Sequence, residues 1–178
     1  KSTEKLVKAS IDAKVSKFIY LSTAHVYCSP LHGEITEENP ILNKHPYALS
    51  HKIGEDAILF HSKAAKNFEG VVLRLSNGVG VPANRNANCW MLAVNDFCRQ
   101  AMESGIIEIN SPSAVERDFF PITLLCDTIN SIVCLDKTNK KIINVSSSKT
   151  KSLQEIIEII TNRTEKLFGF KPEIVFKN

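Results

Sequence analysis

The amino-acid sequence predicts an α/β protein built around a mainly parallel sheet. Short apolar runs such as KFIYLS and GVVLRL are rich in strand-forming residues and have the length of buried strands. Segments with a helical spacing of apolar residues separate these runs, and strands separated by helices imply crossover connections and parallel pairing. The 178 residues, of which 43% are hydrophobic and 23% charged, suffice for a globular protein with a sizeable core.

The first half of the chain alternates between helix and strand. A helix is expected over 2–15 and a buried strand over 17–22, followed by a polar loop punctuated by prolines. A longer helix is expected from Tyr47 to about Asn67, with the next strand over 70–75. The apolar stripe expected on this longer helix consists of Ile53, Ala57, Phe60 or His61, and Ala64.

The second half is more irregular. A loop over 77–88, rich in glycine, proline and asparagine, is expected to lie near a site. The helix expected over 89–104 carries on one side Trp90, Val94, Phe97 and Ala101. The remaining expected elements are strands over 106–109, 141–146 and 173–176, and helices over 122–135 and 152–168, the last capped by Ser152.

The number of strands and the pattern of glycines indicate which part of a doubly wound fold the chain represents. Only about three long strands precede the irregular part, whereas a doubly wound nucleotide-binding sheet usually has about six. The seven glycines include no GxGxxG turn, and the chain begins at Lys1 rather than Met. We therefore expect the C-terminal part of a Rossmann-like doubly wound parallel sheet plus a small α/β region, with the first strand and its Gly-rich turn upstream.

The composition argues against several classes of function. The net charge of +3 is small and the basic residues are scattered, so no nucleic-acid partner is expected. Five cysteines without a CxxC pair favour neither a disulfide framework nor a zinc site, and the histidines show no metal-binding spacing. No metal is therefore expected, and a reducing, cytoplasmic setting fits better. No apolar run approaches the roughly 18 residues of a membrane helix, so no membrane partner is expected.

Two hydroxyl-bearing residues stand where a parallel sheet holds its ligands. Thr23 follows the strand FIYLS, at the carboxyl end where α/β proteins bind ligands, and Tyr47 starts the next long helix. A hydroxyl at a strand end and a phenol on the following helix can face one substrate oxygen. The hydroxyl would orient that oxygen while the phenol moves the proton that accompanies hydride transfer. The pattern indicates carbonyl–alcohol redox chemistry.

Four segments in this order, FIYLSTAHVY, PYALSHKIGED, VVLRLSNGVGVP and ERDFFPITLLCDTI, resemble the extended short-chain dehydrogenase/reductases, in particular the NAD-dependent epimerase/dehydratase family of the nucleotide-sugar branch. The resemblance covers almost the whole chain. It implies that residues 1–80 are the C-terminal part of an NAD(P)-binding Rossmann domain. It also implies that 81–178 are mainly a substrate-binding region, with 117–150 returning to the Rossmann core. The residue that selects NAD or NADP would lie upstream.

The resemblance implies roles for individual residues. Thr23 matches the hydroxyl that holds the substrate oxygen, and Tyr47 matches the catalytic tyrosine. The cofactor, NAD or NADP, would be contacted by Ser22, Tyr47, His51, Leu75 and Ser76. The nucleotide-sugar substrate would be contacted by Thr23, by Asn77, by Asn88 at the start of a helix, and by Arg117, whose guanidinium suits a diphosphate.

The sequence departs from the family pattern four residues after the tyrosine. The family has a lysine there, which binds the nicotinamide ribose and lowers the tyrosine pKa through its charge. This sequence has His51, and the Gly54–Glu55 pair fixes that register, while Lys52 is rotated away from the face of Tyr47. A neutral imidazole can still hydrogen-bond a ribose hydroxyl, so His51 is expected as the third catalytic residue. The alternative is a solvent-facing His51 without a role.

The substrate-facing residues also have plain structural explanations. Asn77 and Asn88 could form turns, and Arg117 could pair with Glu116 or Asp118 on the surface. The sequence favours the binding role for Asn77 and Arg117, and for Asn88 it slightly favours the role in a turn.

The family's dehydratases carry an acidic pair directly after the position of Thr23, and this sequence has Ala24 and His25 there. We therefore expect an NAD(P)-dependent epimerase or oxidoreductase that acts on a nucleotide sugar, similar to UDP-glucose 4-epimerase, in surface polysaccharide synthesis. A homodimer formed through the helices beside the sheet is a further implication of the family. The alternative is a non-catalytic dinucleotide-binding module that kept the fold after losing the lysine.

Overall fold

The structure is a computed structural model that describes residues 2–84, 86–110 and 116–177. The described residues form two compact units. The first unit holds the residues up to Ser76 together with Thr123–Ser146, and the second holds Asn77–Ile122 together with the residues from Ser147 onward. The expected roles of residues 1–80 in binding NAD(P) and of residues 81–178 mainly in binding the substrate remain predictions.

Three parallel strands form the sheet of the first unit. Their order is β1 (Lys17–Thr23), β2 (Glu69–Leu75) and β6 (Ile142–Val145). The β2 side chains of Val71, Val72 and Leu73 are completely buried, as expected for a strand covered on both faces. The parallel pairing predicted from the alternation of strands and helices is therefore confirmed.

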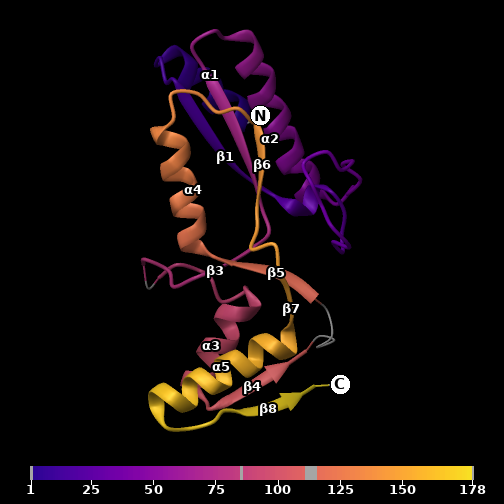
Figure 1. Ribbon diagram of the computed structural model, residues 1–178, viewed down its shortest axis with the longest axis vertical. Helices are drawn as coiled ribbons and strands as arrows, with labels where there is room; N and C mark the ends of the chain where they lie inside the picture. Colours follow the sequence, from indigo (N-terminus) through magenta and orange to yellow (C-terminus); the bar gives the residue numbers. More distant parts are fainter. Residues whose placement is uncertain (1, 85, 111–115, 178) are drawn as a thin grey trace. The chain divides into compact units, whose positions relative to one another are not determined.

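Helices accompany this sheet in the same unit (Figure 1). Helix α1 (Ser2–Asp12) packs against α2 (Pro46–Ala64), and α2 packs on β1 and β2. The short 3₁₀ helix η1 (Ala24–Val26) follows β1 directly, and α4 (Ile122–Cys134) leads back to β6. A cluster of Val7, Ile58 and Phe68 forms the core between α1, α2 and the sheet.

The second unit contains two small sheets. Strand β5 (Glu116–Pro121) pairs in parallel with β3 (Asn77–Val79) and antiparallel with β7 (Thr150–Ser152). Strand β4 (Ile106–Ile109) pairs in parallel with β8 (Glu173–Phe176). The sequence patterns predicted β4 and β8 but not β3, β5 and β7, which are short or carry several charged residues.

Two helices supply most of the core of the second unit. Helix α3 (Ala93–Glu103) packs against α5 (Leu153–Phe168). Ser152 caps α5 as predicted, and with Glu155 it forms a reciprocal capping box. The buried cluster consists of Val94, Phe97, Ala101, Ile107, Ile109, Leu153, Ile156, Ile157 and Ile160. None of the described helices combines the length and the apolar character that crossing a bilayer demands.

Two details of the predicted helices are wrong. The buried face of α2 consists of Ala48, Gly54, Glu55 and Ile58. By contrast, 63% of Ile53 and 69% of Phe60 are exposed. Hydrophobicity alone misplaces this face because it counts neither a glycine nor a paired carboxylate as an interior residue. The helix predicted from residue 89 begins at Ala93, so Trp90 lies outside it.

Candidate active site

The carboxyl ends of β1 and β2 bring several predicted site residues together. Thr23 and Leu75 are direct partners in the parallel register, and Leu75 is also the partner of Val145 at the end of β6. Ser76 follows at once, and its backbone N–H donates to the carbonyl of Val145 at 3.1 Å. This edge is where open α/β sheets bind ligands.

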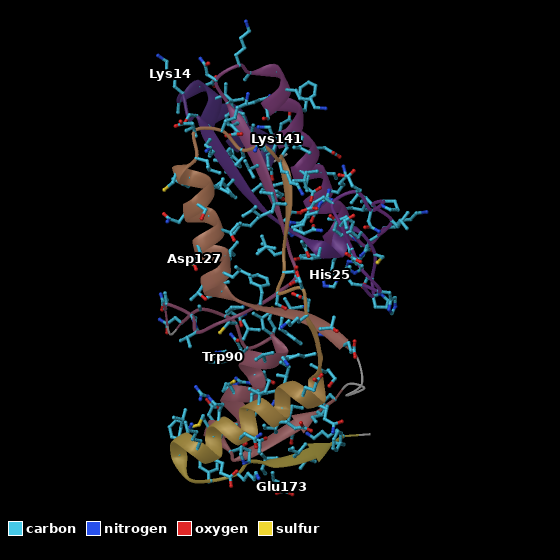
Figure 2. All side chains as sticks on the ribbon, viewed as in Figure 1. Lys14, His25, Trp90, Asp127, Lys141 and Glu173 are labelled. Atoms are coloured by element: carbon cyan, nitrogen blue, oxygen red, sulfur yellow. The ribbon has the colours of Figure 1, made fainter. Side chains whose placement is uncertain are left out.

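Thr23 is held in place as a helix cap. Its Oγ1 accepts a hydrogen bond from the backbone N–H of His25 at 3.2 Å, which caps η1, and the residue is only 5% exposed. Figure 2 labels His25 at this end of the unit. A hydroxyl that accepts one bond keeps its own O–H to donate. Thr23 can therefore still offer a hydrogen bond to a ligand oxygen.

Tyr47 lies in the first turn of α2. His45 caps this helix, because its Nδ1 accepts from the backbone N–H of Tyr47 at 3.2 Å, and Pro46 occupies the first helical position. Both devices specify where the helix begins and therefore where the phenol projects. Tyr47 is 52% exposed, so its hydroxyl is accessible to a small molecule. The structure does not bury it in the core.

His51 lies against the ring of Tyr47. The two ring centroids are 4.7 Å apart with an edge-to-face angle of 66°, and the ring of Tyr20 lies 6.1 Å from His51 on another side. Burial raises the pKa of Tyr20. Lys52 instead pairs with Asp56 along the same helix. The expected geometry is thus confirmed, since the residue four places after Tyr47 shares its face and Lys52 does not.

The ring of His51 contains a buried polar atom without a partner. Its Nδ1 is buried and lacks a hydrogen-bond partner within the described residues. A buried nitrogen without a partner is costly, and in a native site it is usually satisfied by a ligand or an ordered water. The position next to a half-exposed phenol makes this atom a candidate ligand contact.

A buried ion pair joins the inner face of α2 to β2, and the sequence patterns did not predict it. Glu55, on α2, is completely buried. Its carboxylate accepts from Arg74 Nη2 at 2.7 Å and Nε at 3.0 Å, and from the hydroxyl of Ser22 at 2.6 Å. The Ser22 side chain, predicted to contact a cofactor, is therefore committed to the interior, and only its backbone is left for that predicted role.

The network continues from Arg74 toward β6. Arg74 Nη1 donates to the hydroxyl of Tyr27 at 2.9 Å, and that hydroxyl donates to Asn144 Oδ1 at 2.8 Å. Burial disfavours the charged guanidinium, but its bonds to Glu55 and Tyr27 outweigh this cost and raise the pKa of Arg74. The network ties α2 and β2 to the segment after β1. It therefore holds the elements that carry Thr23 and Tyr47.

A sequence signal for this network exists. Arg74 interrupts the apolar run GVVLRL, and a charged residue inside a buried strand requires a buried partner. The search for that partner would have to choose among all the acidic residues of the chain. Only the three-dimensional arrangement identifies Glu55, eight residues after Tyr47.

Apart from Thr23, the residues predicted to bind the substrate lie in the second unit. Asn77 Nδ2 donates to the backbone carbonyl of Asp118 at 2.8 Å, which links β3 to β5. Arg117 is exposed on β5 and has no ion pair within the described residues, and its neighbour Glu116 accepts a hydrogen bond from the hydroxyl of Thr150. Asn88 is exposed in the loop before α3 rather than at the start of that helix.

The carboxylate of Asp118 is engaged in a turn. It accepts from the backbone N–H and the hydroxyl of Ser147 at 3.0 and 2.8 Å and from the backbone N–H of Lys149 at 3.2 Å. No ion pair joins it to Arg117 within the described chain. The surface pairing that the sequence left open for Arg117 is thus not observed with either neighbour.

Comparisons with known proteins identify the family and the fold. The NAD dependent epimerase/dehydratase family matches residues 1–149. An Arabidopsis thaliana protein provisionally named UDP-arabinose 4-epimerase 4 is 27% identical over 177 residues, covering 89% of this chain and 40% of that protein. Human dTDP-D-glucose 4,6-dehydratase is 38% identical over 78 residues, covering 44% of this chain and 22% of that protein.

Solved structures show the same fold. A UDP-glucuronic acid 4-epimerase from Bacillus cereus in complex with NAD superimposes with a TM-score of 0.80 at 24% identity, covering 98% of this chain and 54% of that chain. An NAD-dependent NDP-hexosamine 5,6-dehydratase gives a TM-score of 0.81 at 21% identity, covering 99% and 55%. The predicted Rossmann-like α/β fold is thereby confirmed, and the chain spans about half the length of these solved proteins. Because the family match extends over most of its residues, the chain belongs to the NAD dependent epimerase/dehydratase family of extended short-chain dehydrogenase/reductases.

Proposed function

We propose that the protein containing this chain is an NAD(P)-dependent enzyme that epimerises, or oxidises and reduces, the sugar of a nucleotide sugar. The observation that carries the proposal is the half-exposed phenol of Tyr47 against His51, on a helix packed beside the strand that ends at Thr23. The relatives support it, because their names describe epimerases and dehydratases of UDP- and dTDP-linked sugars.

A nicotinamide cofactor fits the residues present. The buried, unpartnered Nδ1 of His51 matches a ribose hydroxyl, which can donate to the nitrogen or accept from it. Leu75 and Ser76, at the end of β2, would border the same cofactor. When bound, the nicotinamide would supply the hydride acceptor and donor at the sugar carbon.

Tyr47 would be the acid and base of the reaction. It would take the proton from the sugar hydroxyl during oxidation and return a proton to the keto oxygen during reduction. Thr23, whose oxygen already accepts from His25, would donate its own O–H to the same sugar oxygen and orient it. In an epimerase the keto sugar would turn between the oxidation and the reduction, so that hydrogen would return to the opposite face of the same carbon.

His51 would replace the family lysine as the partner of the tyrosine. A phenol ionises near pH 10 in water, so a neighbouring positive charge is needed to favour the phenolate at neutral pH. An imidazole supplies that charge only when it is protonated, whereas the ammonium group of a lysine carries it throughout the neutral range. His51 would therefore hold the ribose and support the phenolate more weakly than a lysine.

The substrate diphosphate would be bound by the second unit. Arg117 is exposed without a partner in the described chain, and a guanidinium suits bidentate binding of phosphate. Asn77 would offer its Oδ1, because its amide nitrogen already donates to β5. Asn88 would be a further diphosphate contact from the loop, without the helix N-terminus that the sequence had suggested.

The residues after Thr23 favour epimerisation or simple redox chemistry over dehydration. Ala24 and His25 occupy η1, where dehydratases of the family carry an acidic pair. Removal of water needs one group that protonates the leaving hydroxyl and a second that takes the proton from carbon, and Ala24 and His25 do not supply that pair of carboxylates. We place the enzyme in surface polysaccharide synthesis in the cytoplasm, which is consistent with five unpaired cysteine thiols.

The test uses the full-length protein, its cofactor fluorescence and a panel of UDP-, GDP- and dTDP-sugars. Tyr47→Phe should lower kcat by about 10² to 10³-fold while nicotinamide fluorescence is retained, because only the proton-transfer group is removed. Tyr20→Phe is the matched control, since it removes the other phenol beside His51, and it should keep most of the activity.

One outcome would replace this proposal with the non-catalytic module. In that outcome the wild-type protein binds nicotinamide, changes no sugar of the panel, and gains no activity from His51→Lys. The observation that favours the module is the absence of the family lysine at position 51.

The proposed assembly is a homodimer that uses the outer face of α2. Ile53 and Phe60 are large, apolar and mostly exposed there, and Leu6 on α1 is exposed as well. Exposed apolar side chains gathered on neighbouring helices are typical of protein interfaces. A second copy of the chain would cover this face.

A further inference from the structure

A cavity of about 1020 Å³ opens at the end of the first unit where the strands begin. The turn between α1 and β1, the end of α2, and the segment between α4 and β6 border it. Thr23 and Leu75 end their strands at the opposite edge, so this cavity is separate from the candidate active site. Figure 2 labels Lys14 and Lys141 at this end and His25 at the other.

Ammonium groups dominate the charged lining of this cavity. Its basic residues are Lys14, Lys17, Lys63, Lys66, Lys137 and Lys141, and its acidic residues are Glu69 and Asp136. Six ammonium groups against two carboxylates leave a net charge of +4. The chain as a whole carries only +3, so the positive charge is concentrated here.

Only some of these lysines are neutralised inside the protein. Glu69 pairs with Lys141 at 2.7 Å and with Lys17 at 3.5 Å, and Lys17 also donates to the carbonyl of Ile132 near the end of α4 at 2.7 Å. The four lysines that have no ion pair within the described residues are Lys14, Lys63, Lys66 and Lys137.

The ends of three helices could account for part of this charge. Helices α1, α2 and α4 all end at the cavity, and each C-terminus carries roughly −0.5 charge, about −1.5 in all. Adding this negative charge to the net charge of +4 of the lining side chains leaves about +2.5. Compensation of the helix dipoles therefore explains some of the lysines but not all of them.

Lys14 adds a second observation. It has a φ of 58°, in the left-handed region that glycine adopts without cost and a lysine adopts rarely. The turn that ends α1 would be less strained with glycine at this position. A lysine in a strained turn beside a cationic cavity suggests that its ammonium group has a function there.

The geometry points to a binding site for a polyvalent phosphate anion, either an inorganic di- or triphosphate or the phosphate chain of a nucleotide. The four unpaired lysines come from three segments of the rim, so one monovalent anion cannot contact them all. A chain of two or three phosphates spreads three or four negative charges over several ångströms. It therefore matches the positive charge that the helix ends leave uncompensated. The volume lies just above the roughly 300–1000 Å³ of small-molecule sites.

The test measures binding of inorganic pyrophosphate and tripolyphosphate to the full chain by calorimetry at fixed ionic strength. Lys63→Gln/Lys66→Gln should weaken binding by about tenfold, because two of the free ammonium groups are lost. Lys5→Gln/Lys166→Gln removes the same charge from exposed lysines of α1 and α5 and should leave binding unchanged. Equal affinities of the two double variants would overturn the proposal.

Further binding measurements identify the ligand and distinguish this site from the proposed substrate site. Adenosine triphosphate binding more tightly than tripolyphosphate would assign the site to nucleotides, and equal binding would assign it to the phosphate chain alone. Arg117→Gln should leave pyrophosphate binding intact. If Arg117→Gln abolishes it and the cavity variant does not, the anion binds elsewhere and the proposal fails.

Lys14→Gly provides a test that folding defects cannot imitate. Glycine relieves the left-handed strain, so the thermal midpoint should rise while pyrophosphate binding weakens. A variant that is more stable and binds pyrophosphate as well as the wild type would show that Lys14 does not serve the anion.

Discussion

At the scale of single residues, Glu55 and Arg74 place two opposite charges in the interior of the first unit. Each is satisfied by the other and by hydroxyl groups, so neither charge is left uncompensated. The pair joins α2 to β2, the elements that carry Tyr47 and Leu75. Its role is therefore to position the candidate site rather than to react.

Removing one partner of this pair should destabilise the protein strongly. Glu55→Gln leaves the buried guanidinium of Arg74 unbalanced and should cost about 3–5 kcal/mol of unfolding free energy, measured by urea denaturation. Asp56→Asn, the exposed neighbour on the same helix, is the control and should cost less than about 1 kcal/mol. A loss of similar size in both variants would contradict the importance of burial.

The interactions of Glu69 should make part of the free energy of unfolding sensitive to acid. Burial opposes its ionisation, but hydrogen bonds from Lys141 and Thr138 prevail and lower its pKa to about 2. Because the folded pKa is below the unfolded value of about 4.5, the stabilisation is present above pH 4.5 and is lost as the pH falls toward 2.

We expect this contribution to be about 2 kcal/mol after screening by solvent. Glu69→Gln should therefore flatten the dependence of unfolding free energy on pH between 4.5 and 2. The measurement is a series of urea titrations across that range. An unchanged slope would show that other carboxylates account for the acid sensitivity.

The side chain at position 51 should influence how the rate of the proposed reaction depends on pH. His51→Lys places a permanent positive charge near the Tyr47 phenol, which should lower the pH optimum by about one unit or raise the rate at pH 7 about tenfold. The measurement is a profile of kcat against pH. Lys52→Gln is the control, because Lys52 pairs with Asp56, and it should leave the profile unchanged. Identical profiles for wild type and His51→Lys would contradict the proposed role.

At the scale of elements, helix α2 has two faces with different tasks. The inner face uses small or paired residues to approach the sheet closely. A Cβ added at Gly54 would collide with the hydroxyl end of the Tyr20 ring, so a larger residue fits there only if that ring shifts. The outer face carries exposed apolar side chains.

Gly54→Ala should therefore destabilise the fold although alanine favours helices by about 1 kcal/mol. The displaced Tyr20 ring should cost about 1–3 kcal/mol, measured as a lower thermal midpoint. Adding Tyr20→Val, which removes the ring, should recover part of the loss. A stable Gly54→Ala protein would mean that α2 can move away from β1 at no cost.

At the scale of the whole molecule, the proposed homodimer depends on the outer face of α2. Ile53→Asp/Phe60→Asp should convert the protein to a monomer, because two charges would then have to be buried without partners. Light scattering coupled to gel filtration measures the mass in solution. Met91→Asp changes an even more exposed apolar residue of the second unit and should leave the dimer intact. A wild-type monomer would exclude this interface.

How much of the fold could be predicted differs between the two units. In the first unit every long strand and helix was predicted, because apolar runs and helical spacing are strong there. In the second unit β5 begins with Glu116, Arg117 and Asp118, and no pattern of hydrophobicity predicts a strand from three charged residues. Its pairing with β3 and β7 supplies the stability that the local sequence lacks.

By itself, the sequence determined the kind and order of most elements and the spacing that sets His51, not Lys52, against Tyr47. Those features depend on helical periodicity and on caps, which act between residues a few positions apart. Only the tertiary structure decided which face of α2 is buried, where the charge of Arg74 is neutralised, and how lysines from separate segments gather around one cavity. Each of these depends on contacts between distant segments, since a charge can be buried only where folding has brought its partner.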